Sequence, residues 1–164
     1  MLFRSVDTVS VGAVGSYTFT NVTENHAIVA TFAIQTFTVS ASAGPNGSVT
    51  PAGVTTVNYN GSASYTISPA TGYFIADVFV DSVSIGPVGS YTFNNVTSDH
   101  TIEAAFAIRT FTVSATAGPN GGIAPAGVSV VNYGDTLSYT ITPNTGYFIA
   151  DVHVDSVSVG AVTS

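Results

Sequence analysis

The 164-residue sequence contains no cysteine, no tryptophan and no lysine, and Arg4 and Arg109 are its only strongly basic residues. Without cysteine there can be no disulfide, no thiolate nucleophile and no cysteine-based metal site. Without lysine there can be no Lys–Asn isopeptide cross-link of the kind that some surface fibres use. Packing and backbone pairing must therefore hold the folded chain together.

Charge of either sign is scarce, and positive charge is almost missing. Charged residues make up 7% of the chain, against about a quarter in ordinary globular domains. Nine Asp and Glu residues leave a formal net charge of −7. Two cations cannot neutralise a run of phosphates, which excludes nucleic-acid binding through a basic surface and disfavours anionic membranes. Polarity comes from Ser, Thr, Asn and Gly, and this profile predicts an extracellular or cell-surface protein.

Long apolar runs are also missing, although the mean hydropathy is +0.42. The longest nearly apolar stretch covers residues 27–34. A helix that spans a bilayer needs about 20 apolar residues, so we expect no membrane insertion. No secretory signal pattern follows Met1, and export would depend on a signal outside this segment.

An internal repeat of 74 residues dominates what is present. Phe37 recurs at Phe111, and His26 recurs at His100. Residues 35–90 and 109–164 are identical at 39 of 56 positions, and residues 6–34 and 80–108 at 20 of 29, in both cases without a gap. The sequence therefore divides into 1–34, the C-terminal part of a repeat, 35–108, one complete repeat, and 109–164, the N-terminal part of the next.

Each repeat has the pattern of short strands. Phe37, Val39 and Ala41 alternate with polar residues, as in a strand with one buried face. Turns are predicted at 44–47, at 69–72 and at 81–82, and Asn60-Gly61 predicts a tight hairpin. The segment 73–80 is apolar on both faces, which predicts a central strand. Since no stretch has sustained helical periodicity, we expect an all-β fold of six or seven strands per repeat, as a small β-sandwich or an open barrel.

The junction between repeats has a signal of its own. Phe106 and Ile108 are apolar at even positions, whereas Phe111 and Val113 are apolar at odd ones. This change of phase predicts a bulge or crossover at Arg109-Thr110, and the same change occurs at Gln35-Thr36. Because no flexible linker separates the repeats, we expect a semi-rigid rod.

The complete repeat contains the motifs Phe37-Thr38-Val39-Ser40-Ala41, Gly44-Pro45-Asn46-Gly47, Gly72-Tyr73-Phe74-Ile75, Val80-Asp81, Tyr91-Thr92-Phe93, Val96-Thr97 and His100-Thr101-Ile102. With these motifs the repeat resembles the divergent internalin-type B repeat of bacterial and archaeal surface proteins, and the resemblance covers essentially the whole chain. That family implies β-grasp-like, β-rich modules that form stalks or accompany adhesion and are appended to many secreted proteins. The sequence departs from the better-known members, which carry Gly-Trp after the aromatic turn, where this chain has Ile75-Ala76-Asp77-Val78.

One cluster of residues has the pattern of a chemical site. Asp151, His153 and Asp155 alternate along a predicted strand, which places them on one face. Two carboxylates and an imidazole could bind a divalent metal or orient a general base. However, Phe79 occupies the place of His153 in the preceding copy, which favours a solvated strand face. We therefore expect no metal requirement, no cofactor and no catalytic activity.

Other patterns favour structural roles. His26 and His100 precede the last predicted strand of their repeats, and local hydrogen bonding in a turn explains them best. No Ser–His–acid constellation stands out in the sequence, and the motif G-x-S-x-G does not occur. Eight tyrosines and ten phenylalanines could form a sugar-stacking platform, but most fall at inward-facing positions and favour a core.

These observations favour a structural repeat module of an extracellular stalk, adhesin or filament. Its expected partners are adjacent repeats of the same chain or neighbouring copies of the protein. The alternative is a carbohydrate-binding accessory module of a secreted enzyme, with surface glycans as ligands. A lectin needs exposed aromatics or a polar cluster in every copy, whereas a stalk needs only pairing and packing.

The two partial repeats suggest how copies would assemble. Residues 1–34 have the sequence of the tail that 109–164 lacks, at the opposite end of the expected rod. Strand addition between chains would then give a head-to-tail filament. The alternative is that the segment is a portion of a longer array, in which its own neighbouring residues complete both partial repeats.

Overall fold

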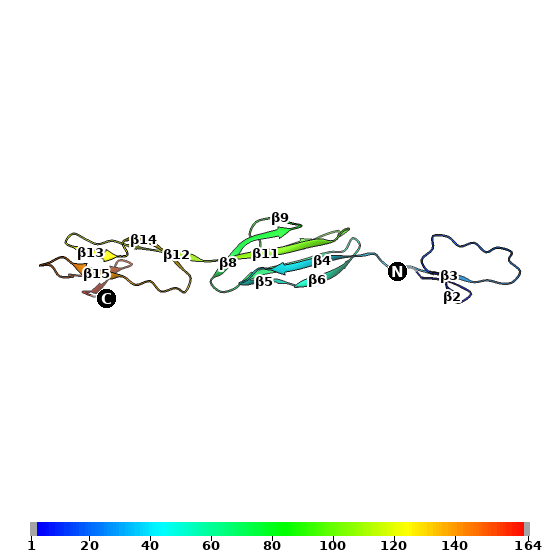
Figure 1. Cartoon of the computed structure of the whole chain (residues 1–164), viewed down its shortest axis with the longest axis horizontal. Helices are drawn as coiled ribbons and strands as arrows, with labels where there is room; N and C mark the ends of the chain where they lie inside the picture. The colour runs from blue at the N-terminus through cyan, green and yellow to red at the C-terminus, as the bar shows by residue number, and fades with distance from the viewer. Residues whose placement is uncertain (1–2, 163–164) are drawn as a thin grey trace.

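The computed structural model describes residues 3–162, which form strands and no helix, as the sequence predicts. Three groups of strands lie in a row along the longest axis, with residues 36–108 in the middle (Figure 1). Residues 3–31 lie at one end and residues 110–160 at the other. In the described part of the chain, no helix is long and apolar enough to cross a membrane.

The central repeat, residues 35–108, contains a sheet of five strands. Its order is β6-β4-β11-β8-β9, and β4 and β11 run parallel while the other neighbours are antiparallel. A β-bulge interrupts the pairing of β11 with β8 between Ala105 and Phe106. The strands of this sheet are β4 (Thr36–Ala43), β6 (Gly53–Asn58), β8 (Tyr73–Val80), β9 (Val83–Ser84) and β11 (His100–Ile108).

A second sheet of three strands completes the central repeat. Its antiparallel strands are β10 (Ser90–Phe93), β7 (Ala63–Pro69) and β5 (Gly47–Thr50), in that order. The repeat therefore has eight strands, where the sequence predicted six or seven. Asp81 and Ser82 both have positive φ in the β8–β9 hairpin, as a tight primed turn requires.

Most turns carry the chain from one sheet to the other. The predicted hairpin at Asn60-Gly61 is wrong, because β6 pairs with β4 and β7 pairs with β5. The turn is tight, with Asn60 at φ 59° and the Gly61 N–H donating to the Asn58 carbonyl at 2.7 Å, but it joins strands of different sheets. The turns at 44–47 and 69–72 also connect the two sheets.

Side chains from both sheets bury a single core. Val39 and Ile102 of the larger sheet and Tyr65 and Ile67 of the smaller one are almost fully buried. Phe37, Ile75 and Phe106 pack against this cluster from its margin. The alternation of Phe37, Val39 and Ala41 predicted this inward face of β4 correctly. The buried members of the cluster are Val39, Ala41, Val49, Val57, Tyr65, Ile67, Val78, Phe93, Val96, Ile102 and Ala104.

The two outer segments form smaller sheets. Residues 3–31 give a three-stranded antiparallel sheet of order β2-β1-β3, made of β1 (Phe3–Val6), β2 (Val9–Ser10) and β3 (Ile28–Thr31). The C-terminal segment forms three separate antiparallel pairs, β12-β14, β13-β15 and β16-β17. Their bounds are β12 (Thr110–Ala115), β13 (Gly121–Ala124), β14 (Gly127–Asn132), β15 (Thr140–Pro143), β16 (Val152–Val154) and β17 (Val157–Gly160).

The strand over 73–80, β8, is an interior strand of the sheet, as predicted: it lies between β11 and β9, while the middle position belongs to β11. One detail differs from the sequence-based expectation. The change of apolar phase was assigned to Arg109-Thr110, whereas the bulge lies three residues earlier, after Ala105. Only Arg109 separates β11 from β12, so the chain leaves the central repeat without a linker.

Hydrogen bonds and one aromatic contact fix the junction that follows the central repeat. The Arg109 N–H donates to the Gly72 carbonyl at 2.8 Å, and its Nε donates to the Tyr73 carbonyl at 3.1 Å. The Tyr133 N–H donates to the Arg109 carbonyl at 2.8 Å. The Tyr133 ring lies against Gly72, where an added Cβ would come within 2.5 Å of it. Gly72 therefore allows the next repeat to pack directly on the central one.

Truncation of a core valine should destabilise the central repeat. Val39 is 0% exposed and Val54, on the neighbouring strand, is 68% exposed. Val39→Ala removes buried methyl groups and leaves a cavity, so we expect a loss of about 2 kcal/mol in the free energy of unfolding. Val54→Ala, the matched control, should change it by less than about 0.5 kcal/mol. Urea unfolding measures both, and equal losses would contradict the assigned core.

The contact between Gly72 and the Tyr133 ring should determine how well ordered the backbone at the junction is. Gly72→Ala places a Cβ against the ring at a φ of +84°. Gly146→Ala, its counterpart in the next copy, has φ +85° and meets nothing within 4 Å. Both variants strain the backbone by about 1–2 kcal/mol, so their difference isolates the ring contact. We expect faster hydrogen exchange at the Arg109 and Tyr133 amides in Gly72→Ala only. Equal exchange in both variants would argue against the contact.

Candidate functional site

The predicted cluster of Asp151, His153 and Asp155 is only partly assembled in the structure. His153 Nε2 lies 3.7 Å from an Asp151 carboxylate oxygen. Asp151 precedes β16, and Asp155 lies in the turn after it with φ 50°, so the three residues do not alternate along one strand. Among residues 3–162, no group of three or more His, Cys, Asp or Glu side chains is arranged to hold a metal ion.

Asp151 instead holds the β16–β17 hairpin together. One of its carboxylate oxygens accepts hydrogen bonds from the Val152 N–H at 2.8 Å, the Ser158 hydroxyl at 2.8 Å and the Gly160 N–H at 3.1 Å. The Ser158 bond, the largest influence, and the two backbone bonds lower the pKa of the Asp151 carboxyl. In the central repeat Asp77 binds Val78, Ser84 and Gly86 at the same distances. The same set of hydrogen bonds therefore fixes the corresponding hairpin in both repeats.

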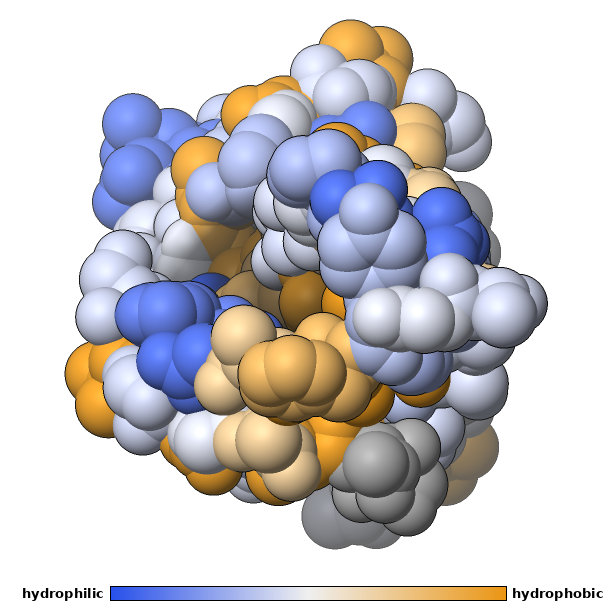
Figure 2. Space-filling model, turned by 90° about the vertical axis from the view of Figure 1, so that its left-hand side faces the viewer, coloured by the Kyte–Doolittle hydropathy of each residue, from blue (hydrophilic) through white to orange (hydrophobic). Residues whose placement is uncertain are grey.

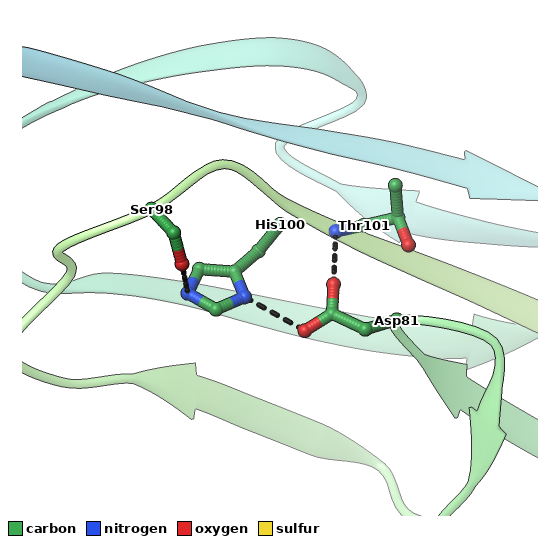
Figure 3. A network of polar contacts seen from close by, with 4 residues as sticks. All are labelled: Asp81, Ser98, His100 and Thr101. Carbon is green, nitrogen blue, oxygen red and sulfur yellow. Dashed lines mark hydrogen bonds and ion pairs between the residues drawn. The ribbon is translucent and has the colours of Figure 1, made fainter.

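A second polar cluster was missed in the sequence, where no Ser–His–acid constellation stood out. His100 Nδ1 lies 2.7 Å from Asp81 Oδ2, and its Nε2 lies 3.4 Å from the Ser98 hydroxyl. The Thr101 N–H donates to the other Asp81 oxygen at 2.8 Å. Figure 3 shows the Asp81 carboxylate between the imidazole and this backbone amide.

The hydrogen bonds of Asp81 define its protonation. Burial acts to raise the pKa of the Asp81 carboxyl, but bonds from the His100 ring and the Thr101 N–H outweigh it, so the pKa lies below its usual value. An ionised carboxylate only accepts, so the His100 Nδ1–H donates to it. In the neutral imidazole Nε2 is then an acceptor for the Ser98 hydroxyl. A serine, an imidazole and a carboxylate are thus in the order used for nucleophilic catalysis.

The other copy of this cluster favours a structural role. His26 Nδ1 lies 2.7 Å from Asp7 Oδ2, and the Ala27 N–H donates to Asp7 Oδ1 at 3.0 Å. Glu24 stands where the central repeat has Ser98. The Asp–His pair is therefore kept without the serine. The constant offset of 19 residues between Asp and His in both copies was the available signal for this contact.

The His–Asp pair connects the tight hairpin turn to the core. Asp81 occupies the β8–β9 turn, and His100 begins β11, the middle strand of the sheet. The His100 ring stacks on Phe93, with centroids 5.0 Å apart and planes at 30°. His26 stacks on Phe19 in the same way, at 4.9 Å and 25°. The pair thus fixes the start of the middle strand against both the hairpin and the aromatic core.

Aromatic residues form a pair that recurs on the surface. Phe37 and Tyr59 have ring centroids 6.4 Å apart at 43°, and Phe111 and Tyr133 repeat this geometry at 6.4 Å and 44°. Both tyrosines are about half exposed. The two tyrosines are therefore repeated exposed aromatics of the kind that a sugar-binding surface would need.

Comparisons with known proteins add no family or relative. No protein-family model matches the chain, and neither the curated proteins nor the solved structures gave a significant match.

Asp81 should contribute to stability above the pH at which its carboxyl is protonated. The unfolded chain takes up this proton near the ordinary pKa of about 3.9, and the folded chain does so at lower pH. The unfolded state therefore binds more protons in that interval, and stability falls as pH falls through it. Asp81→Asn removes this titration, so its unfolding free energy should decline less steeply between about pH 4 and pH 2.

Asp135→Asn is the matched control for this pH dependence, because Asp135 is exposed and lies in the next repeat, outside the unit whose unfolding is followed. Its unfolding free energy should follow that of the wild type at each pH. Urea unfolding of the central repeat at a series of pH values measures all three proteins. The same slope in Asp81→Asn and wild type would contradict the role assigned to the His–Asp pair.

Proposed function

We propose that the chain is a structural repeat module of an extracellular stalk, adhesin or filament, built from tandem 74-residue β-sandwich repeats. The shared core of the two central sheets supports the sandwich, and the sequence identity between copies supports the tandem arrangement. The scarcity of charge and the wealth of hydroxyl and amide side chains support an extracellular location. The internalin-type resemblance, which rests on sequence motifs alone, agrees with this role.

The observation that carries the proposal is the parallel pairing of the first and last strands of the repeat. The chain enters the central repeat through β4 and leaves it through β11, and these strands are direct neighbours over five pairs, from Val39↔His100 to Ala43↔Ala104. Tension along the rod pulls β4 and β11 in opposite directions along their own axes. All the hydrogen bonds between them must then fail together, whereas hydrogen bonds peeled from one end fail one after another.

The junction supports transmission of force from one repeat to the next. A Tyr N–H binds the junction carbonyl in both copies, Tyr59 to Gln35 and Tyr133 to Arg109, each at 2.8 Å. Adjacent repeats of the same chain are therefore the first partners of each module. Neighbouring copies of the protein are the second.

The alternative remains a carbohydrate-binding accessory module. The repeated pairs Phe37–Tyr59 and Phe111–Tyr133 favour it, because each presents a half-exposed tyrosine in the same geometry. The contact of Tyr133 with Gly72 gives at least one of these rings a role in the junction instead. Retention of the chain on an insoluble polysaccharide, lost on Tyr59→Ala, would favour the carbohydrate-binding module.

Pulling direction should decide the force at which the central repeat unfolds. Because the chain has no cysteine, handles can be attached at introduced cysteines only. Gln35→Cys with Thr110→Cys loads β4 and β11 in shear, and we expect a high unfolding force. Gln35→Cys with Asn58→Cys pulls at the same end of the antiparallel β4–β6 pair and opens it from Thr36↔Asn58 onward. Single-molecule stretching that gave equal forces for the two attachments would contradict a tension-bearing role.

A further inference from the structure

Four Asn-x-Ser/Thr motifs occur in the chain, and this motif is the acceptor of N-linked glycans in exported proteins. They begin at Asn21, Asn46, Asn60 and Asn95. A motif this short also arises by chance in a chain rich in Asn, Ser and Thr. The repeat and the structure together separate the motifs that a turn explains from those that it does not.

Two of the four motifs belong to tight turns. An added Cβ would come within 2.2 Å of another atom at the glycine of Asn46-Gly47, and within 2.8 Å at that of Asn60-Gly61. Both asparagines have positive φ, at 69° and 59°. The next copy lacks both motifs, since it has Asn120-Gly121-Gly122 and Gly134-Asp135-Thr136 at these places. Turn geometry therefore accounts for these two Asn-Gly pairs without a glycan.

The motif Asn95-Val96-Thr97 is kept in the other copy, as Asn21-Val22-Thr23. The residues beside it are not kept. Within 94–99, all three residues outside the motif differ from their counterparts in 20–25. The motif is therefore retained inside a segment that otherwise changes between copies.

Packing explains only the middle residue of this motif. Val96 is 1% exposed and belongs to the core of the central repeat. Its N–H donates to the Gly61 carbonyl at 3.0 Å, and its carbonyl accepts from the Asn60 N–H at 2.9 Å. These bonds use the backbone alone, so they set no requirement for the side chains of Asn95 and Thr97.

The side chains of Asn95 and Thr97 are exposed, on either side of the buried valine. Among residues 3–162, neither side chain has a hydrogen-bond partner. Asn95 has φ 52°, a conformation that favours Asn, Asp or Gly, but Thr97 has no positive φ that would select its side chain. The amide and the hydroxyl of the motif are thus open to solvent, as a surface-attached glycan requires.

We infer that Asn95, and its counterpart in each repeat, carries an N-linked oligosaccharide. The inference rests on the proposed extracellular role, because the transferase that makes this linkage acts on exported chains. Its donor is an oligosaccharide bound through its anomeric carbon to a lipid diphosphate. The Asn95 amide nitrogen forms a bond to that carbon and releases one proton. The bond from the carbon to the diphosphate oxygen breaks, and the lipid diphosphate leaves with its electron pair.

An oligosaccharide would supply hydration that the side chains provide only weakly. Charged residues make up 7% of the chain, and lysine is absent. Figure 2 shows one end of the molecule, where strongly hydrophilic residues form small patches among weakly hydrophilic and apolar ones. Glycosylation adds a bulky, solubilising group at the surface. One glycan per repeat would compensate for the scarcity of charge along the rod.

The position of Asn95 also places the glycan beside a strand edge. β6 is the outermost strand on one side of the five-stranded sheet, and none of its residues is charged. It ends two residues before Asn60, whose N–H binds the Val96 carbonyl. Proteins protect such edges with lysine, proline or a covering segment. A hydrated oligosaccharide on Asn95 would cover the end of β6 and hinder its pairing with a strand of another chain.

Mass spectrometry of the chain purified from the cells that produce it tests the inference. Chymotryptic cleavage after Phe and Tyr places the four motifs in separate peptides, 20–32, 38–59, 60–65 and 94–106. We expect 20–32 and 94–106 to carry the added mass of an oligosaccharide and the other two peptides to be unmodified. Peptide 94–106 found only without added mass, or all four peptides modified alike, would overturn the inference.

Substitution of Thr97 tests whether the motif itself is recognised. Thr97→Ala removes the hydroxyl of the motif, so the added mass should disappear from 94–106 and stay on 20–32. Thr97→Ser is the matched control, and it should keep the glycan because it keeps a hydroxyl. Produced without glycosylation, both variants should have the wild-type unfolding midpoint in urea. A glycan retained in Thr97→Ala, or a lower midpoint in that variant alone, would contradict the role assigned to Thr97.

Failure of this inference and failure of the proposed function can be told apart in the same cells. A chain that lies outside the cytoplasm without added mass on 94–106 removes the glycan and leaves the structural role in place. A chain confined to the cytoplasm overturns the extracellular role and the glycan with it.

Discussion

Pairing of β11 with β4 on one side and with β8 on the other is the constraint on which the fold of the repeat depends. It joins the first strand of the repeat, β4, to its last strand, β11, and the paired residues Val39 and His100 lie 61 residues apart in the sequence. It also carries Ile102 and Ala104 into the core between the two sheets. In residues 109–162, where the described strands include no such partner, the strands form separate pairs, and Val113 is 39% exposed whereas its counterpart Val39 is fully buried.

Aspartate performs a structural function in this protein that salt bridges perform in others. Asp77, Asp81 and Asp99 each accept hydrogen bonds from backbone N–H groups, and each also binds a hydroxyl or an imidazole. Charge-assisted hydrogen bonds of this kind are stronger than neutral ones, and they need no cation. A chain with two arginines can therefore keep its carboxylates satisfied while it fixes its turns.

Features of the fold that depend on the local residue pattern could be predicted from the sequence, whereas features that depend on which strands pair could not. Alternation identified β4 and its buried face, and the sequence predicted the turn at Asp81-Ser82, which the structure shows to close the β8–β9 hairpin. The partner of each strand was beyond such patterns: Asn60-Gly61 looks like a hairpin turn, yet it carries the chain between sheets because β6 is already bound to β4. The apolar character of 73–80 predicted a strand inside a sheet, and β8 is paired along both edges, but Phe74 on one of its faces is 42% exposed.

The same distinction between local pattern and strand pairing holds for the polar sites. Asp151 and His153 were predicted as neighbours from their spacing and do lie close, at 3.7 Å. Ser98, His100 and Asp81 come together only because β11 lies beside the end of β8, so their contact needed the sheet order. The repeat can partly replace knowledge of the sheet order, because two residues that keep the same sequence separation in both copies are candidates for a contact.

The Arg109 contacts have a consequence for digestion. Proteases that cleave after basic residues find two targets in this sequence, Arg4 and Arg109. Cleavage requires a stretch of backbone to detach and extend in the protease cleft, so it depends on the burial and hydrogen bonding of that backbone. The Arg109 N–H, carbonyl and guanidinium are all bound, to Gly72, Tyr133 and Tyr73 in that order. The one trypsin-sensitive peptide bond between the repeats is thus closed to the enzyme for as long as the junction stays folded.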